Sequence, residues 1–402
     1  MRKRLAMRPV PEKTATKILW QPPRLRHAEE EGDRRATWLE LFYDLIFVAA
    51  IAELSHYLES HISWTGLLEF VTLFVPLWWC WIGATFYASR FDTDDLSDRL
   101  FAVVQMGIVA AMAVNMHNGL THTTGFALCY IAFHSVLIGQ YLNAGFHIPA
   151  VRPLSMAYAI GFGCSAVLWL ASLMVPAPWR FVFWALGLVI EFATPIICRQ
   201  FVIRVPPSAT HLPERMGLFT IIVLGEAIVA VVSGLSGQQW GWASTSVAFL
   251  GLAAAVSLWW LYFDTADGSP LHGMHEGRFN AAVIWLYAHL PLAIGLVLLG
   301  VGVERMVVRN VESLPTDAER YLLCGAVALS LTALAAIHLL RCTIGTAKLR
   351  ATLSAYRLGS AALAMAIAGF GGELSALTVV AVVSLGCAFQ VAIDLARGVR
   401  LS

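Results

Sequence analysis

The stretch Glu214-Arg-Met-Gly-Leu-Phe-Thr-Ile-Ile-Val-Leu-Gly-Glu226 opens an apolar run that continues to residue 235. A run of about 20 apolar residues is long enough to cross roughly 30 Å of hydrocarbon as an α-helix. Similar runs recur along the chain, in which 58% of the 402 residues are hydrophobic and only 13% are charged. A water-soluble core cannot absorb so much apolar surface, so the sequence indicates an integral membrane protein.

The apolar runs predict an all-α polytopic membrane protein with about twelve transmembrane helices. They occupy residues 38–59, 67–88, 99–118, 124–144, 154–175, 180–201, 214–235, 242–263, 279–303, 320–340, 352–371 and 374–396. Cytoplasmic loops of membrane proteins retain Lys and Arg. Alternating sides along the chain places all Lys and Arg residues except Arg180, Arg305, Arg309 and Arg320 on one side. Both termini are therefore predicted to face the cytoplasm.

The first residues, 1–35, form a basic tail that contains several prolines and lacks the apolar stretch of a cleavable signal peptide. We predict that this tail is disordered and cytoplasmic. Its basic residues suit attraction to the headgroups of the lipid bilayer, and a net charge of +1 gives no reason to expect a nucleic acid partner.

Metal and cofactor motifs are not predicted. The seven cysteines show no paired spacing for a metal or a disulfide. The loop His272-Gly-Met-His275-Glu276 contains metal-binding side chains, but its glycine-rich flanks provide no rigid element to hold a coordination geometry. We therefore expect neither a metal site nor a cofactor.

Acidic positions recur in the two halves of the chain with a nearly constant offset. The matches are Glu40 with Glu214, Glu53 with Glu226, and Phe91-Asp92-Thr93 with Phe263-Asp264-Thr265. Six spans separate the copies, and an even number keeps both in the same orientation. This predicts two parallel six-helix repeats, residues 36–205 and 206–402, around an axis normal to the membrane. Chance similarity between apolar spans is the alternative, although the matched positions are acidic rather than apolar.

Carboxylates inside apolar spans need a partner or a water-filled cavity, because inserting one costs about 2.5–3.5 kcal/mol. Glu53 and Glu226 are predicted to lie at similar depth and to face a shared interior. There they would take and release protons or coordinate a cation, with His56 as a proton partner. The alternative is that each carboxyl is protonated or hydrogen-bonded to neighbouring helices, for instance to Ser55 or Ser233, and holds the bundle together.

A second group of charges is predicted near the cytoplasmic end of the first and seventh spans. Glu40 and Asp44 lie four residues apart and so share a helix face. Arg215 lies at the start of the seventh span, where pairing with Asp44 or Glu40 across the repeats would form a buried ion pair. Glu214 is explained by the preference of acidic residues for the first turn of a helix.

Three further acidic residues are candidates for a structural or gating role. Asp92 and Asp264 end the second and eighth spans, where they either cap the chain or help to gate a pathway. Glu191 stands four residues before Pro195, and a proline inside a helix frees backbone carbonyl groups. Glu191 therefore marks either a structural kink or an ion site.

Three stretches together resemble the bacterial low temperature requirement A (LtrA) family. They are Thr37-Trp-Leu-Glu-Leu-Phe-Tyr-Asp44, Arg90-Phe-Asp-Thr-Asp-Asp95 and Glu214–Glu226. The resemblance spans roughly residues 34–400, and Tyr43 stands where Phe is commoner in the family. It implies a multi-pass protein of the bacterial inner membrane, in a family named for a growth defect in the cold and without an established biochemical activity.

These observations leave three functional hypotheses. The first is a transporter or channel for protons, cations or a cation-coupled small solute, with Glu53 and Glu226 at a shared interior. The second is an integral-membrane enzyme acting on lipid or lipid-linked substrates through Glu40, Asp44 and Arg215, although the chain contains no familiar reactive motif. The third is a membrane sensor for cold or envelope stress. Assembly as a homo-oligomer is compatible with all three.

Overall fold

The computed structural model describes most of the chain, in eight stretches. They are residues 21–25, 37–92, 96–236, 241–264, 268–274, 277–309, 313–340 and 346–397. The tail predicted at 1–35 lies outside them apart from residues 21–25. His275 and Glu276 of the predicted loop, and the residues that follow Asp92 and Asp264 in the acidic matches, also lie outside.

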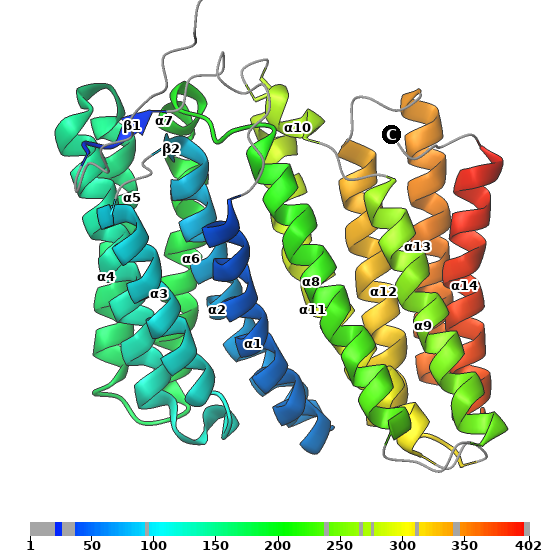
Figure 1. Cartoon of the computed structure of the whole chain (residues 1–402). Helices are drawn as coiled ribbons and strands as arrows, with labels where there is room; N and C mark the ends of the chain where they lie inside the picture. Colours follow the sequence, from blue (N-terminus) through cyan, green and yellow to red (C-terminus); the bar gives the residue numbers. More distant parts are fainter. Residues whose placement is uncertain are drawn as a thin grey trace, which may run out of the picture.

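Twelve long helices fill the described part of the chain, one for each predicted span, and they stand side by side (Figure 1). Their bounds are α1 Trp38–Ser60, α2 Trp64–Arg90, α3 Leu96–Val114, α4 Thr123–His147, α5 Arg152–Ser172, α6 Trp179–Ile197, α8 His211–Ser236, α9 Trp242–Phe263, α11 Phe279–Val308, α12 Asp317–Leu340, α13 Ala347–Phe370 and α14 Ala376–Ala396. Eleven of them are long and apolar enough to cross a membrane, by length and composition. The remaining one is α1, which carries four carboxylates. The prediction of an all-α polytopic membrane protein is confirmed.

Short elements lie between the long helices. They are η2 Gly119–Thr121, η3 Pro149–Val151, α7 Arg199–Arg204, α10 Ser269–His272, and the two-residue strands β1 Arg24–Leu25 and β2 Phe91–Asp92. The strands pair antiparallel, with Arg24 opposite Asp92. A described piece of the N-terminal tail is thereby held against the end of α2.

The start of α1 is set by its own sequence. The Thr37 hydroxyl accepts a hydrogen bond from the Glu40 backbone N–H at 3.3 Å, and the Glu40 carboxylate accepts one from the Thr37 N–H at 2.7 Å. This reciprocal capping box satisfies two backbone donors that the first helical turn would otherwise leave unpaired. It also fixes the position of Glu40 at the end of the helix.

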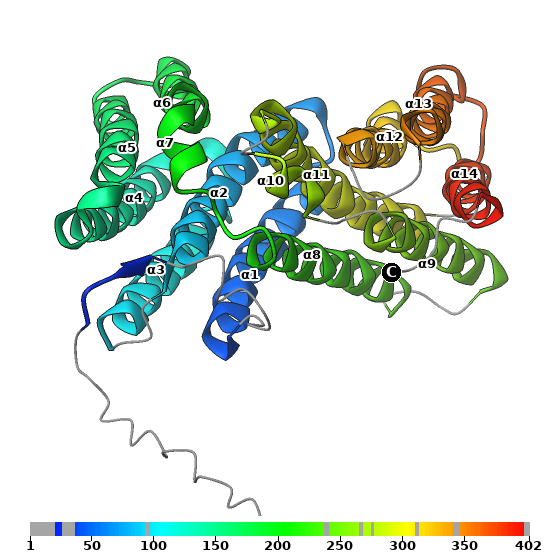
Figure 2. The same cartoon turned by 90° about the horizontal axis from the view of Figure 1, so that it is seen from above.

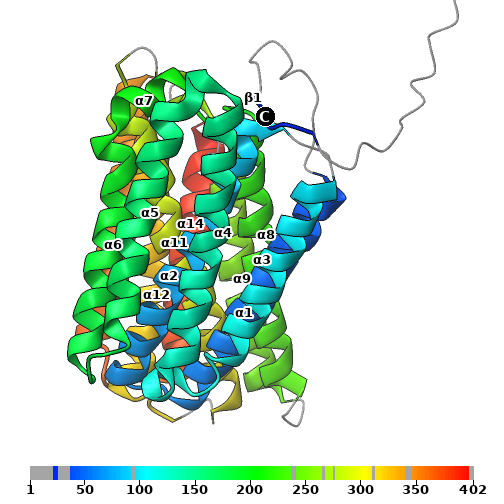
Figure 3. The same ribbon diagram turned by 90° about the vertical axis from the view of Figure 1, so that its left-hand side faces the viewer.

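The long helices form two groups, seen from above in Figure 2. We call α1–α6 the first lobe and α8–α14 the second lobe. Within the first lobe, α1 and α3 are inclined to α4, α5 and α6 (Figure 3). The lobes meet where α1 and α2 pack on α8 and α11, and this contact is called the seam.

Some helix pairings recur in the two lobes, as a duplication predicts. α1 packs on α3, α3 on α4 and α4 on α5, and the corresponding pairs α8–α11, α11–α12 and α12–α13 also pack together. The last helices differ, because α6 packs on α5 whereas α14 packs more extensively on α9 than on α13. The internal repeat and its boundaries at residues 36–205 and 206–402 therefore remain a prediction.

Candidate functional site

The seam carries a cluster of buried charges at the end where α1 and α8 begin. Arg215 Nη2 lies 2.5 Å from Asp44 Oδ1, and Arg215 Nη1 lies 3.6 Å from Glu40 Oε1. His211 Nε2 is 3.2 Å from the same Glu40 oxygen. We call this end of the seam, with Glu40, Asp44, His211 and Arg215, the paired end. The pairing of Arg215 with Asp44 and Glu40 across the lobes, predicted from the sequence, is present.

Helical spacing explains how these four side chains meet. Glu40 and Asp44 are four residues apart on α1, and His211 and Arg215 are four residues apart on α8. Residues four apart share a helix face, so each helix presents two charged groups to the other. His211 was missed in the sequence, although its spacing from Arg215 repeats the spacing of Glu40 from Asp44.

The charged side chains of the paired end are buried and therefore need partners of opposite charge. Asp44 is fully buried, and only 2% of Arg215 is exposed. The indole N–H of Trp81 on α2 also donates to Asp44 Oδ1, at 2.8 Å. Two carboxylates therefore face one guanidinium, and the His211 imidazole is the second group of α8 beside Glu40. A buried charge is tolerated when it is paired and hydrogen-bonded in this way.

The other end of the seam gathers carboxylates rather than ion pairs. Glu304 of α11 is 8% exposed and interacts electrostatically with Glu59 of α1 and Glu226 of α8. Glu226 also interacts electrostatically with His56 of α1. We call His56, Glu59, Glu226 and Glu304 the carboxylate end. Glu59 and Glu304 were missed in the sequence because they have no counterparts among the matched acidic positions.

The structure gives Glu53 and Glu226 different neighbours. Glu53 Oε2 lies 3.6 Å from His117 Nδ1, just beyond the end of α3, and the side chains of His117 and Glu53 are 75% and 44% exposed. Glu226 interacts with His56 and Glu304. The hydroxyl of Ser55 donates to the backbone oxygen of Ile51 within its own helix. Of the predicted group, Glu226 interacts electrostatically with His56, whose side chain is exposed.

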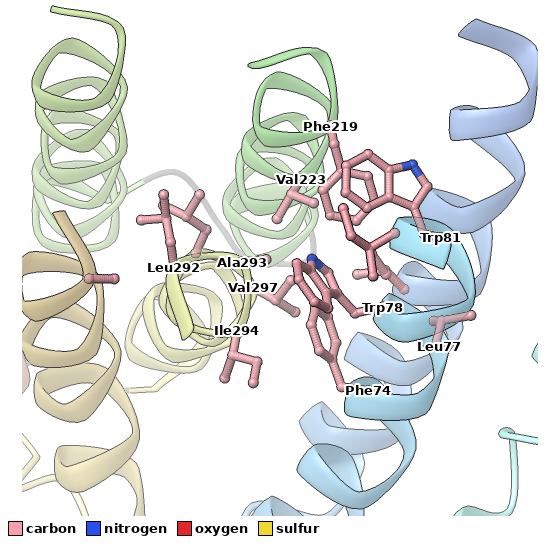
Figure 4. Close-up of a cluster of buried hydrophobic side chains, with 14 of the residues drawn as sticks. Phe74, Leu77, Trp78, Trp81, Phe219, Val223, Leu292, Ala293, Ile294 and Val297 are labelled. Carbon is pink, nitrogen blue, oxygen red and sulfur yellow. The ribbon is translucent and has the colours of Figure 1, made fainter. Parts of the chain in front are cut away.

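Between the two ends lies a block of buried apolar side chains contributed by three helices (Figure 4). We call it the apolar block; it consists of Phe74, Leu77, Trp78 and Trp81 of α2, Phe219 and Val223 of α8, and Leu292, Ala293, Ile294 and Val297 of α11. The rings of Trp81 and Phe219 stack with centroids 4.1 Å apart. On α8, Phe219 and Val223 lie between Arg215 and Glu226. At a helix rise of about 1.5 Å per residue, Arg215 and Glu226 are about 16 Å apart along the helix axis.

The remaining predicted residues lie away from the seam contacts. Glu214 lines a cavity of about 500 Å³ between α8, α9 and α10, together with Thr210 and His272. Asp92 belongs to β2, and Asp264 is the residue at which α9 ends. The side chain of Asp264 is buried and interacts electrostatically with Asp394.

Each lobe also contains a cluster of buried ionisable side chains away from the seam. In the second lobe, Arg357 Nη2 of α13 lies 2.6 Å from Asp394 Oδ2 of α14, a pair that the sequence analysis missed. In the first lobe, Glu191 accepts a hydrogen bond from the Tyr130 hydroxyl and faces His134. The Thr194 hydroxyl meanwhile donates to the Ile190 carbonyl at 2.7 Å, one turn back along the proline-containing helix α6.

Comparison with known proteins places the chain in a family. The family model described as "Bacterial low temperature requirement A protein (LtrA)" matches residues 35–392. An uncharacterized protein of Rhizobium meliloti (strain 1021) is 28% identical over 296 residues, which cover 68% of this chain and 70% of that protein. No solved structure matches the chain. The protein, a multi-pass membrane protein, belongs to the bacterial low temperature requirement A family.

Proposed function

We propose that this protein moves protons, another cation or a cation-coupled small solute across the bacterial inner membrane, with both termini in the cytoplasm. The proposal is carried by one observation: ionisable side chains gather at both ends of the seam, and the apolar block separates them. Ionisable groups inside a membrane protein commonly mark an ion pathway, since their insertion is costly. The seam is then the pathway, in a closed conformation.

The paired end supports a coupling step. Asp44 is held by Arg215 at 2.5 Å, so a proton or cation that binds Asp44 competes with the guanidinium. Neutralising the carboxylate weakens the Coulomb attraction between α1 and α8 at this end, which favours separation of the lobes. A ligand can shift such an equilibrium only by binding the two states with different affinity, and competition with Arg215 supplies that difference.

The carboxylate end supports cation entry from the opposite side. Glu59, Glu226 and Glu304 interact electrostatically with one another or with His56 in the described part of the chain, and such an acidic group raises the local concentration of cations. The apolar block then prevents continuous leakage, because an apolar constriction resists hydration. In the simplest transport cycle, the two ends of the seam open in alternation on either side of this block.

The alternative of a lipid-modifying enzyme has less support. It assigned acid, base and anion-binding roles to Glu40, Asp44 and Arg215. Because Asp44 and Arg215 are buried against each other, neither presents a free reactive group to a substrate in this conformation.

Flux into proteoliposomes tests the proposal. Purified protein is reconstituted, a potassium diffusion potential is imposed with valinomycin, and proton and sodium entry are followed with trapped indicator dyes. We expect flux above that of empty vesicles, and a loss of most of that flux in Glu226→Gln and Glu304→Gln. Glu373→Gln is the matched control, because Glu373 is an exposed carboxylate in the turn between α13 and α14. Flux that is absent in the wild type, or unchanged in both variants, would overturn the proposal.

A further inference from the structure

A second set of ionisable groups lies inside the first lobe, among α4, α5 and α6. Tyr130 and His134 come from α4, Ser165 from α5 and Glu191 from α6, and none of the four has exposed surface. Tyr130 stacks on Trp169, with ring centroids 4.0 Å apart. Carboxyl and imidazole groups thus occupy a dry, aromatic interior.

Close helix packing keeps water out of this interior. A Cβ atom at Gly187 of α6 would lie 2.8 Å from Ser165 Oγ and 2.8 Å from Trp169 Nε1. Glycine at this position therefore allows α6 to approach α5 more closely than any other residue would. The Phe162 ring also packs on the His134 ring, with the ring centroids 5.2 Å apart. An ionised carboxylate in such surroundings needs a positive partner.

Hydrogen-bond chemistry determines how many protons the group holds. His134 Nδ1 lies 3.0 Å from the Tyr130 backbone oxygen, and because a carbonyl only accepts, Nδ1 carries a hydrogen. His134 Nε2 lies 3.3 Å from Glu191 Oε1. Two lone pairs facing each other in an apolar interior would repel, so one proton lies between these atoms. The Tyr130 hydroxyl donates to the other oxygen of Glu191.

We infer that Tyr130, His134 and Glu191 form a buried proton-binding site within the first lobe. The site holds one proton, either on Glu191 or on His134, and is electrically neutral in both arrangements. In the described part of the chain, Glu191 also interacts with the Ser165 hydroxyl of α5 and the Cys80 thiol of α2. Both are uncharged as thiol and hydroxyl, so the proton alone compensates the carboxylate.

Asp394, a buried acid of the second lobe, has a different kind of partner. Asp394 is paired with Arg357, and a guanidinium does not release its proton in proteins. Glu191, in contrast, faces an imidazole, which can release its proton. The proton of Glu191 and His134 exchanges when α4 and α6 separate enough to admit water. This coupling of proton exchange to the shape of the first lobe rests on the proposed transport function.

The proton-binding site is tested by spectroscopy on the full-length protein in detergent at neutral pH. Infrared difference spectra between the wild type and Glu191→Gln report whether Glu191 is a carboxylic acid. Nitrogen-15 NMR of histidine-labelled protein, assigned with His134→Gln, reports whether Nε2 is protonated. We expect one of the two groups, and only one, to carry the proton. An ionised Glu191 beside a neutral His134, or protons on both, would overturn the inference.

Glu191→Gln also tests the role of the proton-binding site without disrupting the fold. The glutamine amide donates to His134 Nε2 and its oxygen accepts from Tyr130, so the variant mimics the protonated acid and should fold. If transport is proton-coupled, its flux should lose most of the pH dependence of the wild type, whereas Glu373→Gln retains it. A Glu191→Gln flux with unchanged pH dependence would overturn the coupling role. Absence of flux in every protein would refute the transport function and leave the spectroscopic result standing.

Discussion

The two ends of the seam arrange their ionisable side chains in opposite ways. At the paired end, Glu40 and Asp44 of α1 both face Arg215 of α8, and Asp44 also accepts the Trp81 indole N–H. At the carboxylate end, Glu304 interacts electrostatically with Glu59 and Glu226, and Glu226 with the exposed His56. The first arrangement joins the lobes. The second brings like charges together, which repel.

This difference predicts how substitutions at each end should affect stability. Removing one partner of a buried ion pair leaves an uncompensated charge, whereas removing one carboxylate from an acidic group relieves repulsion. Substitutions at the paired end should therefore weaken the fold. Substitutions at the carboxylate end should affect transport more than stability.

The largest effect is expected from Arg215→Met. Because Asp44 would remain buried without its cation, the variant should lose about 3–5 kcal/mol of stability. Thermal unfolding in detergent, followed by size-exclusion chromatography, measures the loss. The double variant Asp44→Leu/Arg215→Met should recover much of it, since both charges are then gone. A single variant as stable as the wild type would remove the distinction between the two ends.

Phe219→Ala should have the next largest effect. It deletes a buried ring that stacks on Trp81 in the apolar block, which should cost about 3 kcal/mol. The resulting space should also admit water between the two ends, so passive ion leak through proteoliposomes should increase. Phe249→Ala is the control, because Phe249 is 73% exposed on α9. Equal leak in the two variants would show that the block does not separate the ends.

Glu304→Gln should have a smaller and opposite effect on stability. Neutralising Glu304 removes the repulsion from Glu59 and Glu226, so stability should be unchanged or rise by less than about 1 kcal/mol. The same variant should lose most of its ion flux. A destabilisation comparable to that of Arg215→Met would mean that Glu304 belongs to a structural ion pair.

The smallest effect is expected from Glu53→Gln. The neighbouring His117 side chain is 75% exposed, and exposed ion pairs contribute less than about 1 kcal/mol. Unfolding midpoints and flux should both stay close to those of the wild type. A flux loss as large as that of Glu226→Gln would restore Glu53 to the pathway and would return the two matched glutamates to one shared role.

Sequence patterns identified which residues belong to the site better than they identified which residues contact one another. The need of a buried Arg for an acid led to the pairing of Arg215 with Asp44 and Glu40, and the structure contains it. The matched depth of Glu53 and Glu226 did not determine their neighbours. Depth follows from position along a helix, but the direction of a side chain follows from rotation of the helix against its neighbours.

The sequence alone determined that this protein is a bundle of long apolar helices, because a bilayer demands runs of about 20 apolar residues and a backbone that satisfies its own hydrogen bonds. It also determined which of these helices carry costly charges. Only the tertiary structure decided that Asp44 meets Arg215, that Glu304 joins Glu226, and that Glu191 faces His134. Such contacts join helices distant in the chain, and their geometry depends on side-chain packing that no local pattern encodes.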